Sequence, residues 1–144
     1  MNKITKPTST KDIVRAWHLV DVNGKVLGRE AVAIAHKLMG KGKPYFANNM
    51  DCGDYVVVIN AKNVKVTGKK ATDKVYYRHS MYPGGFRSET FKEVMIKNPS
   101  EIIVHAVKGM LPHNKLSAKM LKRLFVFVGA EHKYTDKFGK GETK

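Results

Sequence analysis

The sequence is poor in cysteine, in acidic residues and in long apolar runs, and each shortage excludes a class of protein. Cys52 is the only cysteine among 144 residues, which excludes an internal disulfide and a zinc site built on several cysteines. No stretch approaches the roughly 20 consecutive apolar residues that cross a bilayer. The first residues, Met1 to Lys11, lack the apolar centre of a signal peptide. We therefore expect a protein of a reducing compartment, the cytoplasm.

Acidic residues are outnumbered, since 12 Asp and Glu stand against 27 Lys and Arg and the formal net charge is +15. Such an excess indicates a polyanionic partner, either nucleic acid or an anionic membrane. The basic residues are spread through the chain, which favours a folded domain embedded in a large polyanion. With 42% hydrophobic residues, 1–144 is expected to fold as one domain, with short polar ends at about 1–12 and 133–144 that can be flexible.

The first half of the chain has the pattern of a strand, a helix and a second strand. Trp17 to Val20 predicts a short strand that ends before the turn-forming pair Asn23-Gly24. Apolar residues from Leu27 to Leu38 recur with a helical period, and Gly40 stands where a glycine ends a helix. After a loop, the unbroken apolar run from Tyr55 to Ile59 predicts a strand buried on both faces. This order predicts a right-handed βαβ unit.

The middle of the chain is less regular. Residues 64–66 and 75–77 predict a pair of shorter strands separated by the basic turn 68–70. Residues 79–88 contain Pro83-Gly84-Gly85 and predict an irregular loop.

Helical patterns dominate the last part. Spacing over 91–95 predicts one helix, and Asn98-Pro99 supplies the cap and first-position proline of another, although 102–107 also has strand character. The segment from Lys115 to Arg123 predicts a basic amphipathic helix whose apolar stripe packs inward and whose cations, Arg123 included, point outward. A last apolar strand is expected at 125–128.

Two glycine and lysine clusters, Gly40-Lys41-Gly42-Lys43 and Gly68-Lys69-Lys70, suggest a phosphate-binding loop. Neither has the spacing of a P-loop or of a dinucleotide fingerprint. We interpret both as basic turns able to meet RNA phosphates, and expect no cofactor.

Histidines and carboxylates give little support to a catalytic or metal site. The six histidines show no close metal-ligand spacing, and a lone histidine such as His105 is more often structural. Asp51 and Asp54 flank Cys52 and have the residue type of paired catalytic carboxylates, but in a turn-rich segment they more often cap or turn the chain. We expect no catalytic residue and no metal.

Aromatic and basic residues interleave from Tyr76 to Arg87. Unpaired RNA bases stack on aromatic rings while basic groups hold phosphates, so we expect this segment to touch RNA. Tyr76 or Tyr77 can instead belong to the core, because strand side chains alternate between faces. The basic helix at 115–123 also suits RNA better than a membrane, since its narrow apolar stripe lacks Trp and Phe.

Three blocks of sequence then carry a resemblance: Trp17-His18-Leu19-Val20-Asp21 continuing to Leu27-Gly28-Arg29, the run from Gly53 to Ala61 continuing to Thr67-Gly68-Lys69-Lys70, and Val107-Lys108-Gly109-Met110-Leu111-Pro112 continuing to Gly129. In this order, over about residues 15–133, they resemble the bacterial-type large-subunit ribosomal protein family numbered thirteen. Ser117 and His113-Asn114-Lys115 depart from the family's pattern, so the RNA contacts near them are less defined.

The resemblance implies a three-layer α/β/α domain with a four-stranded, mostly parallel sheet, and a helix after Pro99. It implies a non-enzymatic role in binding and organising large-subunit rRNA early in assembly, beside neighbouring ribosomal proteins and without a membrane or an obligate homo-oligomer. Trp17, Gly28, Asp54 and Gly109 are expected to serve the fold more than to touch RNA. The residues expected to contact RNA are Lys41, Lys43, Lys69, Lys70, Arg78, His79, Tyr82, Arg87, Lys108, His113, Lys115, Lys119, Lys122 and Arg123.

Two other classes of function remain open at this point. An RNA-modifying or nucleotide-using enzyme would need a cofactor pocket at the carboxyl ends of the strands. A free regulatory RNA-binding protein would not sediment with ribosomes.

Overall fold

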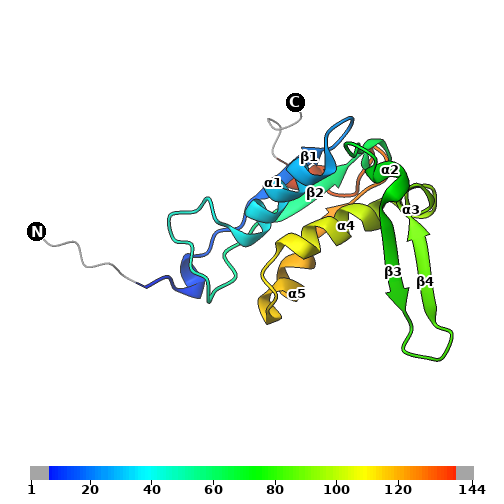
Figure 1. The fold of residues 1–144 in the computed structure, drawn as a ribbon. Coiled ribbons are helices and arrows are strands. Elements are labelled where there is room, and N and C mark those ends of the chain that lie inside the picture. Colours follow the sequence, from blue (N-terminus) through cyan, green and yellow to red (C-terminus); the bar gives the residue numbers. More distant parts are fainter. Residues whose placement is uncertain (1–6, 139–144) are drawn as a thin grey trace, which may run out of the picture.

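The computed structural model describes residues 7–138, and its centre is a parallel sheet (Figure 1). Strand β1 (Trp17–Asp21), helix α1 (Leu27–Met39) and strand β2 (Tyr55–Ile59) form the expected βαβ unit, with Trp17 opposite Tyr55. Strand β5 (Leu124–Val126) pairs in parallel with the other edge of β2, which gives the order β1-β2-β5. The buried run at 55–59 is therefore the central strand, flanked on both sides.

One face of this sheet is covered by helices. Val56 and Val58 of β2 are buried in the same apolar cluster as Ile34 of α1 and Ile103 of α4 (Pro99–Met110). Helix α1 ends as predicted, because Gly40 adopts a left-handed φ of 77°. The helix preferred after Pro99 is present and begins with the proline in its first turn.

The opposite face is covered by aromatic side chains. The ring of Trp17 stacks on Tyr55 at 4.4 Å between centroids, and Tyr134 lies 4.5 Å from Phe125. The three-layer, four-stranded arrangement is not what residues 7–138 form: their parallel sheet has three strands. The sheet advances in one direction from β1 to β2 to β5, so right-handed crossovers place α1 and α4 on one face and leave the other to the C-terminal segment.

A separate two-stranded hairpin contains the strand expected at 75–77, and the loop expected at 79–88 is confined to residues 80–85 at its tip. Strand β3 (Val75–His79) pairs antiparallel with β4 (Phe86–Thr90), and Figure 1 shows the hairpin extending away from the sheet. Residues 64–66 form no strand, only an isolated bridge between Val26 and Lys65. Strand β4 was missed because four of its five residues, Arg87 to Thr90, are polar and leave no apolar alternation.

Short elements connect these parts. They are η1 (Thr10–Asp12), η2 (Ala61–Asn63), α2 (Lys70–Asp73), α3 (Phe91–Lys97), α5 (Lys115–Leu121) and η3 (Thr135–Lys137).

The expectation of flexible ends falls partly on 1–6 and 139–144, which lie outside the described residues. Among the described residues near the two ends, Thr8 donates a 2.8 Å hydrogen bond to the carbonyl oxygen of Tyr45, and the ring of Phe138 lies edge-on to Trp17 with 6.3 Å between centroids. The described parts of both ends therefore pack on the domain.

Candidate nucleic-acid interface

A cluster of buried ion pairs fastens the loop between α1 and β2. Arg123, only 7% exposed, places its guanidinium against the carboxylate of Asp51 and donates 3.3 Å hydrogen bonds to the carbonyl oxygens of Leu38 and Asp54. Because Leu38 lies in the last turn of α1, this cation also stabilises the negative end of that helix. The prediction that Arg123 points outward is wrong: α5 ends at Leu121, so the helical period does not extend to residue 123.

Lys43 and Asp54 form the second part of this ion-pair cluster. The Lys43 ammonium pairs with Asp54 and donates hydrogen bonds to the carbonyl oxygens of Val14 (2.7 Å) and Cys52 (2.9 Å). Asp54, 6% exposed, also accepts a 2.9 Å hydrogen bond from the His18 ring. Lys43 is thus turned inward, contrary to its predicted place among the RNA-facing cations, because its ammonium neutralises a buried carboxylate.

Both carboxyl groups of the ion-pair cluster are held ionised. Burial raises the pKa of Asp51, but the hydrogen bonds and charge of Arg123 outweigh burial, so the pKa lies below its ordinary value. Burial also raises the pKa of Asp54, and the hydrogen bonds from Lys43, the Ala16 amide and His18 more than offset it. A lowered pKa is the opposite of what a general acid needs. Asp51 and Asp54 instead hold the buried cations of Arg123 and Lys43 in place. This role differs from both catalysis and the capping or turning of the chain.

Two glycines let this loop close on the end of α1. Gly40 has a left-handed φ, and a Cβ on Gly53 would lie 1.6 Å from the carbonyl oxygen of Leu38. Only glycine allows that approach. The loop is thereby fixed in place, and the exposed Lys41 projects from a supported segment.

Lysines without an internal partner gather around α4 and α5. Among residues 7–138, Lys108, Lys115, Lys119 and Lys122 are exposed and form no ion pair. The sequence between Glu101 and the next acidic residue, at position 131, contains no carboxylate. The outward orientation predicted for these lysines is confirmed, and no acidic residue between positions 102 and 130 neutralises their charge.

A groove of about 610 Å³ lies between these two helices. His105, Lys108 and Gly109 line it from α4, and His113 and Ser117 line it from the α5 side. A neighbouring depression of about 420 Å³ also borders His105 and Gly109 and is flanked by Lys70 and Lys74. Cations predicted from separate parts of the sequence are therefore brought around one exposed helix face. Lys69, at the start of α2, is exposed beside Lys70.

The hairpin lies against the middle and the first turn of α4. Tyr76 packs edge-on against His105 at 5.3 Å, and Arg78 pairs with Glu89 (3.2 Å) and Glu101 (3.7 Å). Arg78 remains 59% exposed in its side chain, and such surface pairs hold weakly, so its charge stays accessible. In Figure 1 the hairpin and α5 both extend below the body formed by the sheet and α1. Of the remaining residues predicted here, His79, Tyr82 and Arg87 are exposed.

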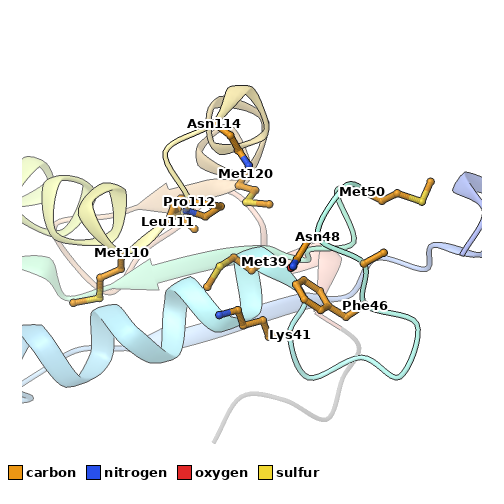
Figure 2. Close-up of a pocket in the computed structure, with 11 residues that line it drawn as sticks. Met39, Lys41, Phe46, Asn48, Met50, Met110, Leu111, Pro112, Asn114 and Met120 are labelled. Carbon is orange, nitrogen blue, oxygen red and sulfur yellow. The ribbon is translucent and has the colours of Figure 1, made fainter.

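Figure 2 shows a further pocket, between the α1–β2 loop and the connection from α4 to α5. Its volume is about 460 Å³, and its lining is mostly apolar, with Met39, Met110, Met120 and Phe46. Lys41 is the one ionisable residue among the lining side chains. The pocket offers no carboxylate, imidazole or thiol for acid–base or nucleophilic chemistry.

The carboxyl ends of the strands, where an open α/β sheet binds cofactors, are occupied by the chain itself. The side-chain amide of Asn60 donates a 2.9 Å hydrogen bond to the carboxylate of Asp21. The backbone amide of Asn60 donates one of 2.9 Å to the carbonyl oxygen of Gly129. Among residues 7–138, no group of three or more His, Cys, Asp or Glu residues is arranged to hold a metal ion. In the same part of the chain, no helix has the length and apolarity needed to span a bilayer.

The fold and this surface define a basic α/β domain whose outward cations suit a polyanion and whose inward cations hold its own loop. The family model described as ribosomal protein L13 matches residues 15–133, and the chain belongs to this family. It is 50% identical over 139 residues to a protein of Dehalococcoides mccartyi, covering 96% of each chain. It is 48% identical over 132 residues to one of Symbiobacterium thermophilum, covering 92% of each. Both relatives are called large ribosomal subunit protein uL13, so the resemblance seen in the three sequence blocks is confirmed.

Some residues play parts that the sequence did not suggest. Tyr77 and Phe86 are largely exposed and stack on each other, a pair that becomes visible only once the hairpin register is known. Trp17 serves the fold as expected, since its ring stacks on Tyr55 among the aromatic side chains that cover one face of the sheet. At Gly28 and Gly109 an added Cβ would meet no atom within 4 Å, so close packing is not what requires glycine there.

Proposed function

We propose that this chain is a structural constituent of the large ribosomal subunit, not an enzyme. It binds large-subunit rRNA and supports early subunit assembly and translation in the cytoplasm, beside neighbouring ribosomal proteins. It acts as one domain, without a membrane and without an obligate homo-oligomer. Membership of the L13 family and the name of its relatives support this function.

The observation that carries the mechanism is the ring of exposed cations around α4. Lys108 lines the groove between α4 and α5, and Lys70 lines the neighbouring depression. The exposed α5 lysines and hairpin arginines lie on the elements that pack against α4. Lysine and arginine at such a surface neutralise phosphates and release condensed counterions. The proposed RNA contacts are therefore Lys41, Lys69, Lys70, Arg78, His79, Tyr82, Arg87, Lys108, His113, Lys115, Lys119 and Lys122.

Arg123 and Lys43 act one step away from the RNA. Their cations hold Asp51 and Asp54, and so fix the loop that carries Lys41 and the junction that follows α5. The RNA-binding surface is thereby formed before RNA arrives, which reduces the ordering cost of binding.

The test is a double charge reversal, Lys108→Glu with Lys119→Glu, in a tagged protein followed by gradient sedimentation. Both side chains are exposed, so stability should change by only about 0.5 kcal/mol per site while incorporation into large subunits falls. Lys133→Glu with Lys137→Glu is the matched control, because both lysines are exposed on the C-terminal segment that covers the other face of the sheet, and the change in net charge is the same.

Native-like circular dichroism with lost incorporation, and an unaffected control, would support the proposal. Equal incorporation of wild type and the Lys108 and Lys119 variant would place the rRNA elsewhere on the surface. Wild-type protein sedimenting apart from ribosomes would instead favour a free regulatory RNA-binding protein. Isolated wild-type protein should also lose RNA affinity log-linearly with salt, and a flat response would contradict a phosphate-based mechanism.

A further inference from the structure

The β3–β4 hairpin has two different faces. Side chains of paired strands alternate, and the register places Tyr76 and Arg78 on the face that meets α4. Tyr77 and Phe86 therefore share the opposite face. Their rings stack with centroids 5.7 Å apart and planes 23° from parallel, and they remain 67% and 60% exposed. We call this surface, with His79 beside it, the aromatic face of the hairpin.

The tip of the hairpin is a built turn. Met81 has a positive φ of 66°, which is unfavourable for a non-glycine residue, and its amide donates a 2.9 Å hydrogen bond to Nδ1 of His79. Gly85 donates a 2.9 Å hydrogen bond to the carbonyl oxygen of Tyr82 and accepts one from the Ser80 amide. Met81 and Tyr82 are thereby held 89% and 75% exposed at the tip. The hairpin places large apolar side chains in solvent without a packing reason within residues 7–138.

Charge and position indicate what covers this surface. Its other members, Val75, Ser88 and Thr90, include no carboxylate. Arg87, which shares the opposite face with Arg78, is exposed and forms no ion pair among residues 7–138. The hairpin extends to the same side as helix α5, whose lysines are exposed, so one polyanion can contact both elements (Figure 1). Flat rings with open faces fit flat nucleobases, while exposed cations elsewhere on the surface neutralise the phosphates of the RNA backbone.

We propose that the aromatic face of the hairpin binds unpaired RNA bases by stacking on Tyr77 and Phe86. This inference rests on the proposed function and adds its ligand class: a loop, bulge or single strand, and not a duplex. Bases inside a duplex stack on each other and present only their edges. Since every base has a π-face, the interaction should show little sequence preference.

The experiment compares two RNA probes with the full-length protein by fluorescence anisotropy. One probe is an oligoadenylate of about ten nucleotides, within the usual site size for stacking proteins, and the other is a mixed-sequence RNA duplex of similar length. Tyr77→Ala with Phe86→Ala should weaken oligoadenylate binding about 5- to 150-fold, while duplex binding and its salt dependence stay unchanged because no cation is lost. Tyr77→Phe keeps the ring and should bind the oligoadenylate as wild type does.

Ile96→Ala is the matched control, because Ile96 is 84% exposed on α3 and its loss removes apolar surface away from the aromatic face. Wild-type affinity of the double variant for the oligoadenylate would overturn the inference alone, as would an equal loss for both probes. Normal RNA binding with lost incorporation into subunits would assign this face to a protein neighbour and also overturn it. Failure of wild type to bind either probe would overturn the proposed function as well.

Discussion

Replacing Arg123 by alanine separates the two roles that this residue can have. In the structure its guanidinium is buried, paired with Asp51 and hydrogen-bonded to the carbonyl oxygens of Leu38 and Asp54. Removing one partner of a buried ion pair costs about 3 to 5 kcal/mol. Arg15, 3.6 Å from Asp51, remains as a partner, so we expect the lower end, about 3 kcal/mol. A domain of ordinary stability, about 5 to 15 kcal/mol, would be severely weakened.

The assay is urea unfolding followed by the fluorescence of Trp17, the only tryptophan, which stacks on Tyr55 in the sheet. Lys119→Ala is the control, since an exposed lysine should change stability by no more than about 0.5 kcal/mol. Asp51→Ala combined with Arg123→Ala should cost less than the sum of the single changes, because the two groups interact directly. Wild-type stability of Arg123→Ala, together with weakened RNA binding, would refute the buried geometry and restore the outward arginine.

Three further outcomes follow from the same structure. Folding lowers the pKa values of Asp51 and Asp54, so their contribution to stability is complete above the ordinary carboxyl pKa of about 3.9 and is lost as pH falls through the folded values. Below about pH 4, the urea midpoint should therefore drop by more in wild type than in Asp51→Asn; parallel pH profiles would contradict this. Val57→Ala should cost about 2 to 3 kcal/mol, because Val57 is 0% exposed, whereas Ile59→Ala should cost less at a half-buried site; equal stability to wild type at Val57 would refute the central strand. Gly109→Ala should raise the thermal midpoint, since alanine favours a helix by about 1 kcal/mol and its Cβ meets no atom within 4 Å, and a lowered midpoint would show a packing role.

The local elements of the first half were readable because each depends on neighbours in the chain. The helical period of 27–38, the glycine at position 40 and the unbroken run 55–59 all correspond to observed features. Helix α4 was ambiguous from its apolar residues alone, and the cap and proline at 98–99 indicated it correctly. Of the hairpin, the strand at 75–77 was predicted, but β4 and its pairing were not, because exposed strands carry little apolar alternation and their pairing cannot be seen without the register.

The family, the basic character and the absence of an enzymatic motif were determined by the sequence itself, because residue types and their order carry them directly. Which cations face outward was decided only by tertiary structure. Lys43 and Arg123 look like surface residues in the sequence, yet each lies near an aspartate from a distant or looping segment, and burial of those carboxylates requires a partner charge. Lys108 and Lys119 have no such neighbour among residues 7–138 and remain exposed. The long-range pairing of opposite charges, which a one-dimensional pattern does not encode, therefore decides which basic residues are buried in the fold and which stay exposed.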